Sequence, residues 1–250
     1  MITQSQRGSA IIVVLIAAVL LTIIGAMAIR SGIFGLRLAT NSQAMHIMDQ
    51  NNDASLFKIQ DSDAIKNYLI GTGLFGFPKM VENRDKELVI CYRGSSSRFY
   101  QVSRASLVSD NSGTLNIEHI GGSARMGFCQ VDDNKTDFVS GRGAAMTQIA
   151  VRIGGISEED DEAFSHYQEG TDSETGKLDE NLRLVVTTTT VMPVLSTADN
   201  DTINSCMIGI SYTDKTSSLE TVSECLSKFN IPYKTQVAEY SLGQFIKKKV

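Results

Sequence analysis

Tryptophan is absent from the 250-residue sequence, and proline occurs only three times. So few prolines exclude a proline-rich linker protein, and none lies before Pro78 to interrupt a long N-terminal helix. No internal repeat has a period of about 20–50 residues, which excludes solenoid and propeller architectures. The net charge is -5 and the main basic run is residues 247–249, so we expect no specific binding of nucleic acid.

Motifs that support catalysis or cofactor binding are also scarce. The histidines His46, His119 and His166 are far apart and lack the spacing of zinc ligands. Residues 71–76 match the glycine pattern of a dinucleotide-binding turn, but helix-like residues precede them and Pro78 stands where a second helical turn would run. We interpret this segment as a loop, and we expect no enzyme activity, no cofactor and no bound metal.

Two acidic segments resemble binding sites only superficially. Residues 132–137 lack the alternation and the closing glutamate of a calcium-binding loop, which favours a solvated turn. Residues 158–162 are all acidic and lie in a Gly/Ser/Thr-rich stretch, 157–179, which is typical of an exposed loop.

The four cysteines, Cys91, Cys129, Cys206 and Cys225, form no C-x-x-C pair, and their spacing does not fit a zinc site. If this part of the chain lies outside the cytoplasm, the even count favours two disulfides. Three connectivities are possible, of which we favour the local pairing of Cys91 with Cys129 and of Cys206 with Cys225.

The longest apolar run extends from Ala10 to Ile29 and contains no charged residue. A helix of about twenty residues crosses a hydrocarbon core of about 30 Å, so this run is long enough to span a membrane. A single-pass anchor and a cleaved secretory signal are both possible, and Ala26-Met27-Ala28 matches the cleavage pattern of a signal. The run is longer than a usual signal core, and its helical pattern continues past this site.

Beyond Arg30 the pattern changes from uniformly apolar to amphipathic. Apolar residues recur at spacings of three, four, seven and eight, which predicts a helix with one apolar face up to about Ile59. We expect this face to pack on a globular head; its residues are Phe34, Leu38, Met45, Met48, Leu56 and Ile59.

The rest of the chain predicts many strands and few helices. Ser217 and Glu220 have the spacing of a capping box, which predicts a helix with Leu219, Val222, Leu226 and Phe229 on one face. A short helix is expected at 61–70. A long helix followed by many strands indicates an α+β fold with the helix packed on an antiparallel sheet. The expected strands are 87–92, 98–104, 114–120, 146–153, 182–194 and 235–246.

The junction Gln6-Arg7-Gly8-Ser9, followed at once by the apolar run, resembles the leader of a type IV prepilin. In that family a membrane peptidase cuts after the glycine and the new N-terminal amine is methylated. The resemblance implies cleavage between Gly8 and Ser9 and N-methylation of Ser9. It divides the chain into a leader (1–8), a transmembrane and filament-core helix (9–29), an amphipathic continuation (30–59) and a disulfide-stapled head (60–250).

Most pilins have a glutamate five residues into the mature chain, and here that position is Val13. In a filament this carboxylate neutralises the buried terminal amine of a neighbouring subunit. In lacking this glutamate, the chain resembles the PilX-type minor pilins and the K-type pseudopilins of type II secretion. Three further segments look PilX-like, namely 38–44, 191–194 and 235–240.

The resemblance implies a minor pilin that primes assembly of a type IV pilus, in a tip complex that supports twitching motility, adhesion and DNA uptake. The implied partners are other minor pilins, the major pilin, the inner-membrane assembly platform and a large tip adhesin. The implied location is the inner membrane, crossed once by residues 10–29 with a periplasmic head, and then the pilus tip. The alternatives are a K-like pseudopilin and a membrane-anchored adhesive domain that does not polymerise.

Overall fold

The computed structural model describes residues 9–61, 63–120, 127–132, 134–154, 182–213 and 217–242. The chain divides into two units, residues 1–47 and residues 48–250, and we refer to the second as the head. The expected leader, residues 1–8, and the acidic stretch 157–179 lie outside the described residues.

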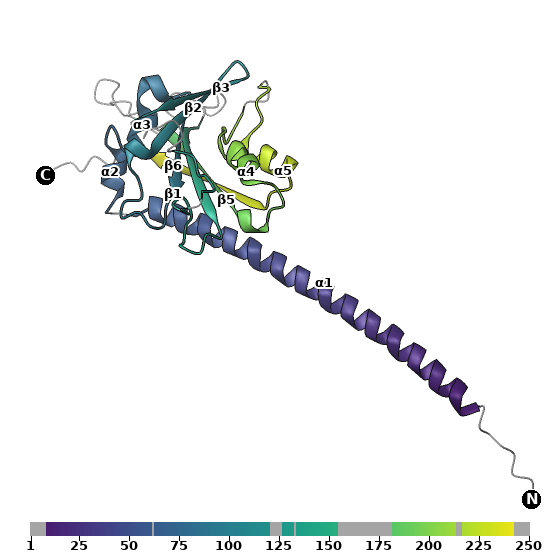
Figure 1. Ribbon diagram of the computed structural model, residues 1–250. Helices are drawn as coiled ribbons and strands as arrows, with labels where there is room; N and C mark the ends of the chain where they lie inside the picture. The colour runs from purple at the N-terminus through teal and green to yellow at the C-terminus, as the bar shows by residue number, and fades with distance from the viewer. Residues whose placement is uncertain are drawn as a thin grey trace, which may run out of the picture. The chain divides into compact units, whose positions relative to one another are not determined.

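One continuous helix, α1, extends from Ser9 to Ile59 (Figure 1). It passes Gly32 and Gly35 without a break, as expected from a segment without proline. The amphipathic face was predicted too broadly, because only Met48, Leu56 and Ile59 are buried. The remaining predicted face residues, Phe34, Leu38 and Met45, are exposed; all three precede Met48, where the head begins.

The head contains a six-stranded sheet in which every neighbouring pair is antiparallel, in the order β3-β2-β1-β4-β5-β6. The long N-terminal helix and this sheet confirm the predicted α+β fold. The strands are β1 (Glu87–Tyr92), β2 (Ala105–Asn111), β3 (Thr114–His119), β4 (Met146–Ile153), β5 (Leu182–Val191) and β6 (Tyr233–Leu242).

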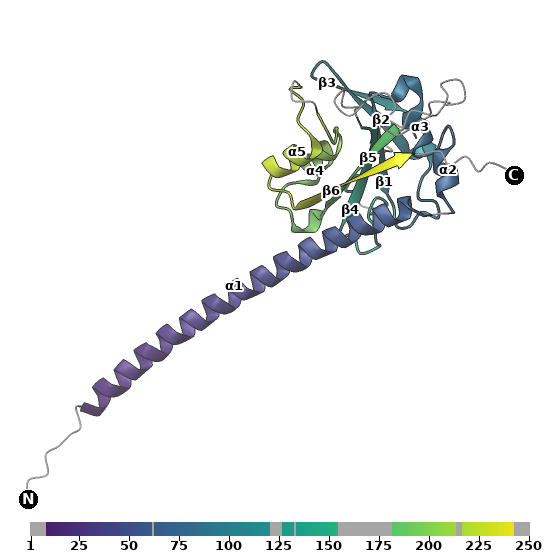
Figure 2. The same ribbon diagram turned by 180° about the vertical axis from the view of Figure 1, so that it is seen from behind.

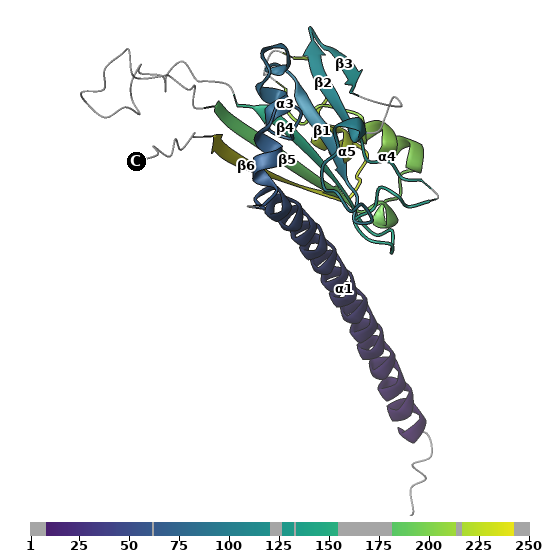
Figure 3. The same cartoon turned by 90° about the vertical axis from the view of Figure 1, so that its left-hand side faces the viewer.

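The inner strands of the sheet are buried on both faces, as β1 illustrates. Its residues alternate between the two faces: Leu88 and Ile90 belong to a first core, whereas Cys91 belongs to a second core and Val89 to a smaller third cluster on the other face. Figures 1, 2 and 3 show short helices on both sides of the sheet. The first core includes residues of α2 (Ile65–Leu69) and α3 (Gly76–Lys79), and the second those of α4 (Asn200–Met207) and α5 (Val222–Lys228).

Within the head, the last turns of α1 contact the sheet through a polar contact as well as an apolar one. Leu56 and Ile59 belong to the first core. Beside them, the fully buried Asn52 accepts a hydrogen bond from Thr190 Oγ1 (2.7 Å) and donates one to the Lys234 carbonyl (3.0 Å). Because an unpaired amide in this position is costly, the contact fixes the register of the helix on β5 and β6.

The predicted strand at 98–104 is wrong. The strand that pairs with β1 is β2, which begins at Ala105, and the segment before it ends in the 3-10 turn η2 (Val102–Arg104). The reason is aromatic packing: Phe99 lies 5.4 Å from Tyr92 and 6.3 Å from Tyr68, measured between ring centroids. These contacts hold the segment against α2 instead of in the sheet.

The predicted capping box is also misplaced by four residues. Ser217 only accepts a hydrogen bond from Leu219 N (3.1 Å), and the reciprocal box joins Thr221 to Glu224 at the start of α5. Glu224 Oε2 accepts from the backbone N–H of Thr221 (2.8 Å), a bond that Glu220 is too early in the chain to make. The predicted helix face therefore starts at Val222, and Phe229 is exposed just after the helix.

Other boundaries differ by a few residues. The segment 71–76, interpreted as a loop, ends at Gly76, where α3 begins, and the turn η1 (Val81–Asn83) follows this helix. β5 ends at Val191 because Pro193 begins the turn η3 (Pro193–Leu195). β6 starts at Tyr233, and residues after Leu242 lie outside the described residues.

Candidate functional site

The apolar part of α1 is uncovered by the rest of the protein. Its large apolar side chains from Ile11 to Ile29 have exposed fractions of 47–70%. By length and composition this helix is able to cross a membrane. Its one hydroxyl within the run is internally satisfied, because Thr22 Oγ1 donates to the Val19 carbonyl (2.7 Å). The segment therefore suits an apolar surrounding of lipid or of other helices.

The predicted processing residues lie at the start of this helix. Ser9 is the first residue of α1, whereas Gly8 lies outside the described residues. Val13 is 61% exposed and lies in the uncharged run. Neither Val13 nor any residue from Ala10 to Ile29 is able to offer a carboxylate to a buried amine.

The four cysteines form two disulfides, Cys91–Cys129 and Cys206–Cys225, which is the local pairing that the sequence favours. Their sequence separations are 38 and 19 residues, so each closes a loop within the head. All four residues belong to or pack against the second core, on the face that holds α4 and α5.

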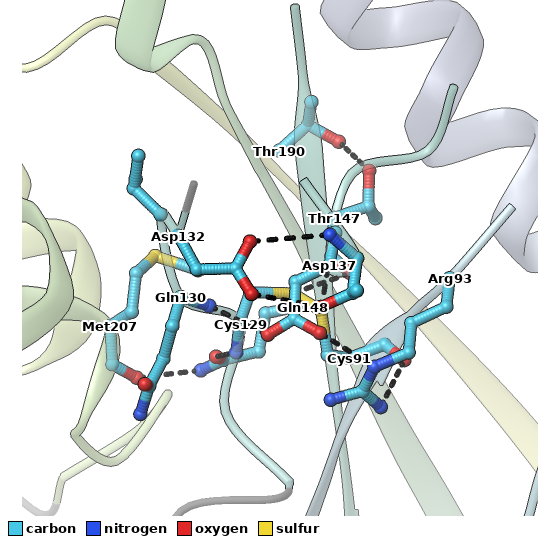
Figure 4. Close-up of a disulfide and its surroundings, with 12 residues drawn as sticks. Cys91, Arg93, Cys129, Gln130, Asp132, Asp137, Thr147, Gln148, Thr190 and Met207 are labelled. Atoms are coloured by element: carbon cyan, nitrogen blue, oxygen red, sulfur yellow. Dashed lines mark hydrogen bonds and ion pairs between the residues drawn. A yellow bond between two sulfur atoms is a disulfide. The ribbon is translucent and has the colours of Figure 1, made fainter. Parts of the chain in front are cut away.

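A buried glutamine links the two disulfides (Figure 4). Gln148, on β4, accepts a hydrogen bond from Cys129 N (3.1 Å) and donates one to the carbonyl of Met207 (2.9 Å), the residue after Cys206. Because one side chain satisfies both groups, the two stapled segments are held at a fixed spacing over the sheet.

An ion pair completes the surroundings of the first disulfide. Arg93 Nε lies 2.6 Å from Asp137 Oδ1, and Asp137 Oδ2 accepts from Gln130 N (3.0 Å). The prediction of a solvated turn at 132–137 is wrong at its end, because Asp137 is buried in this pair. Its first residue does form a turn, since Asp132 accepts from the backbone and hydroxyl of Thr136.

The second disulfide joins two well-capped helices. The Asp199 side chain accepts from Thr202 N (2.6 Å) at the start of α4, and the Thr221–Glu224 box caps α5. These backbone hydrogen bonds hold the pKa of Asp199 and that of Glu224 below their usual values. Both helices are too short to be stable in isolation, so the caps and the disulfide contribute much of their stability.

Glu87 is a buried carboxylate that sequence reasoning missed. It begins β1, is 2% exposed, and receives hydrogen bonds from Ser211 N (2.7 Å), Ser211 Oγ (3.0 Å) and Tyr212 N (3.1 Å). Arg152 stacks on the Tyr212 ring, with 4.0 Å between its Cζ and the ring centroid. Burial raises the pKa of Glu87 to about 7, although the hydrogen bonds and the Arg152 charge oppose the shift.

The sequence-predicted candidates thus fall into separate places. The cysteines come together in pairs, whereas Ser9 and Val13 lie on α1 in the first unit. In the part of the chain that the structure describes, no group of three or more His, Cys, Asp or Glu side chains is arranged to hold a metal ion. No sequence motif marks Glu87, Gln148 or the Arg93–Asp137 pair. Each of them contacts a partner that lies more than 40 residues away in the sequence.

Comparison of the chain with models of known protein families, with curated proteins and with solved structures gives no match.

We predict that removing either disulfide strongly destabilises the head. In the loop-entropy model, closing loops of this length contributes about 3 kcal/mol for Cys206–Cys225 and about 4 kcal/mol for Cys91–Cys129. The double variants Cys206→Ser/Cys225→Ser and Cys91→Ser/Cys129→Ser should lower the free energy of unfolding by roughly these amounts. Urea unfolding followed by tyrosine fluorescence measures the loss, and a change below about 1 kcal/mol for both variants contradicts the stapling role.

We predict that Glu87 makes the head less stable as the pH rises. Because its pKa is raised in the folded state, its contribution is fully present below about pH 4.5 and is lost as the pH rises through about 7. The difference in unfolding free energy between wild type and Glu87→Gln should therefore fall by about 3 kcal/mol between pH 4 and pH 8. Denaturant unfolding at several pH values measures it. A constant difference contradicts the prediction, and Glu82→Gln is the control for loss of an exposed carboxylate.

Proposed function

We propose that this protein is a minor pilin that primes assembly of a type IV pilus and occupies the pilus tip. The observation that carries the proposal is α1 itself, which is uncovered and apolar at its start and continues without a break into the core of a disulfide-stapled head. The Gly8-Ser9 junction immediately before this helix is the second support.

The continuity of α1 distinguishes this arrangement from an ordinary signal sequence. A cleaved signal is discarded, so nothing in the mature protein needs to be continuous with it. Here Leu56 and Ile59, in the same helix as the apolar run, are buried in the head. Cleavage near Ala28 removes the apolar part and leaves residues 30–43, which are exposed, as a projecting helical segment. Cleavage after Gly8 keeps the whole helix.

Val13 supports a leading position in the filament. In the pilin family a carboxylate at this position pairs with the terminal amine of an adjacent subunit, and an unpaired charge is costly among apolar helices. A subunit with valine here cannot neutralise a neighbour's amine in this way. It is therefore best placed where no subunit requires that carboxylate, which is the tip.

The head supports an extracytoplasmic location, first in the periplasm and then at the pilus tip. Disulfides persist in oxidising compartments, and both pairs are formed within the head. In this role the partners are other minor pilins, the major pilin, the inner-membrane assembly platform and a large tip adhesin. The resulting pilus supports twitching motility, adhesion and DNA uptake.

A second candidate is a K-like pseudopilin of type II secretion, since the missing carboxylate at Val13 is common to both groups. Deletion of the gene separates the two: loss of twitching and DNA uptake supports the pilus, whereas loss of protein secretion supports the pseudopilin. A plain membrane-anchored adhesive domain is distinguished by the first prediction below.

We predict that the mature chain begins at N-methylated Ser9. Mass spectrometry of the N-terminal peptide from a host that carries a prepilin peptidase measures this directly. Gly8→Glu should abolish cleavage, because the peptidase requires a small residue before the cut. Ala28→Leu should leave the mature N-terminus at Ser9, although it removes the small residue that a signal peptidase requires. An intact Met1, or a start at Ile29 that Ala28→Leu blocks, contradicts the proposal.

We predict that Val13→Glu leaves processing at Ser9 unchanged but lowers the number of pili per cell. The new carboxylate has no amine to pair with at the tip and is costly among apolar helices, by roughly 2–3 kcal/mol on membrane-insertion scales. Electron microscopy of cells counts the pili, and Val13→Leu is the matched apolar control. Normal numbers of pili in Val13→Glu contradict a strictly leading position.

A further inference from the structure

A hollow of about 980 Å³ lies in the head and has no part in the proposed assembly role. One wall is formed by residues from the end of α1 through α2 to Gly73, and the other by the segment 92–103 that follows β1. Its size is at the upper end of ligand pockets, which are typically 300–1,000 Å³. A ligand of several linked rings therefore fits.

Aromatic rings contribute to both walls. Phe99 and Tyr92 are half-buried, with 5.4 Å between their ring centroids, and Tyr68 lies behind Phe99 at 6.3 Å. Exposed ring surface in a hollow gives an apolar shelf on which the C–H faces of a flat or ring-shaped ligand pack.

The lining carries an excess of positive charge, although the chain as a whole has a net charge of -5. Lys58 and Arg98 are exposed, and the described residues contain no ion-pair partner for either. Asp61 is the one carboxylate among the described lining residues, so it offsets only one of these two positive charges. Two available cations therefore favour an anionic ligand, and the Arg98 guanidinium suits a carboxylate.

The second wall is held rigidly. It follows Cys91 of the first disulfide and contains Arg93 of the buried ion pair. A side chain at Gly94 would collide with the Val139 carbonyl, so glycine is needed for this close approach. Tyr100 donates from its hydroxyl to the Thr72 carbonyl (3.0 Å) and so ties the two walls together. Because these walls are already held in place, a ligand binds without a large entropic cost for ordering them.

We propose that this hollow binds an acidic oligosaccharide, a chain of sugars that carry carboxylates. Arg98 and Lys58 pair with the carboxylates, and the sugar rings pack on Phe99 and Tyr92. The lining also offers side chains that hydrogen-bond to sugar hydroxyls, namely Asn67, Gln101, Ser97 and Ser103.

An extended peptide is a poorer fit to the same walls. Peptides commonly add a strand to a free sheet edge. β1, which leads into the second wall, is paired with β2 and β4 on both sides and offers no free edge. The rest of the lining consists of turns and short helices.

Calorimetric titration of the full-length protein with hexagalacturonate tests this proposal, in a detergent without sugar groups. Binding should be at least about tenfold tighter than that of the neutral hexamer maltohexaose. Arg98→Gln should weaken binding about tenfold, because a charge-assisted hydrogen bond is lost. Lys58→Gln and Phe99→Leu should weaken it by smaller factors, and 0.5 M NaCl should weaken wild-type binding. Lys66→Gln removes the same charge from α2 outside the lining and should bind as wild type does.

The proposal is overturned by no binding of hexagalacturonate at millimolar concentration, by equal binding of maltohexaose, or by unchanged binding in both Arg98→Gln and Lys58→Gln. Equal or tighter binding of a hexaglutamate peptide also overturns it, in favour of a general anion site. Circular dichroism confirms that each variant is folded. Because the unprocessed chain is titrated, failure here leaves the processing at Gly8 untouched.

Discussion

The uncovered apolar surface at the start of α1 is the constraint on which the rest of the structure depends. Thirteen large apolar side chains between Ile11 and Ile29 are exposed. At about 2 kcal/mol each, leaving them in water costs roughly 25 kcal/mol, more than the whole stability of a typical domain. This surface is therefore suited to lipid or to contact with other apolar helices. A subunit that passes from a membrane into a filament exchanges one such surrounding for the other.

The last turns of α1, from Met48 to Ile59, belong to the same compact unit as the sheet. The last turns of α1 contribute Leu56 and Ile59 to the first core, and the buried amide of Asn52 bonds to β5 and β6. On the opposite face the two disulfides and the Gln148 bridge fix α4 and the segment around Cys129. The two faces of the sheet are thus held by different means, side chains of α1 on one and disulfides on the other, which suits a protein displayed outside the cell.

Patterns that depend on neighbouring residues in the chain predicted much of this fold. The residues of α1, β1 and β4 follow directly from a proline-free helical pattern and from runs rich in Val and Ile. Each cysteine pairs with its nearest cysteine in the sequence, as the sequence favoured. The strand prediction failed at Phe99, because this residue packs against Tyr68, 31 positions away, and not in the sheet. The helix α4 was missed for a different reason, since only the capping residue Asp199 marks its start in the sequence.

The candidate sites divide in the same way. The sequence points to Gly8, Ser9 and Val13 because the roles proposed for them depend on their positions relative to an apolar run. Glu87 begins an apolar strand and has no motif, and only the fold brings Ser211 and Tyr212 to its carboxylate. The hollow beside Arg98 was equally hidden, since its walls come from segments about 30 residues apart whose meeting depends on the aromatic cluster.

Immunogold labelling of the head on sheared pili tests the central claim most directly. A subunit that primes assembly and lacks the carboxylate at position 13 should be found once per filament, at one end only. Gold particles at a single end support the account. Particles spaced along the shaft, or filaments without any label in cells that make the protein, contradict it.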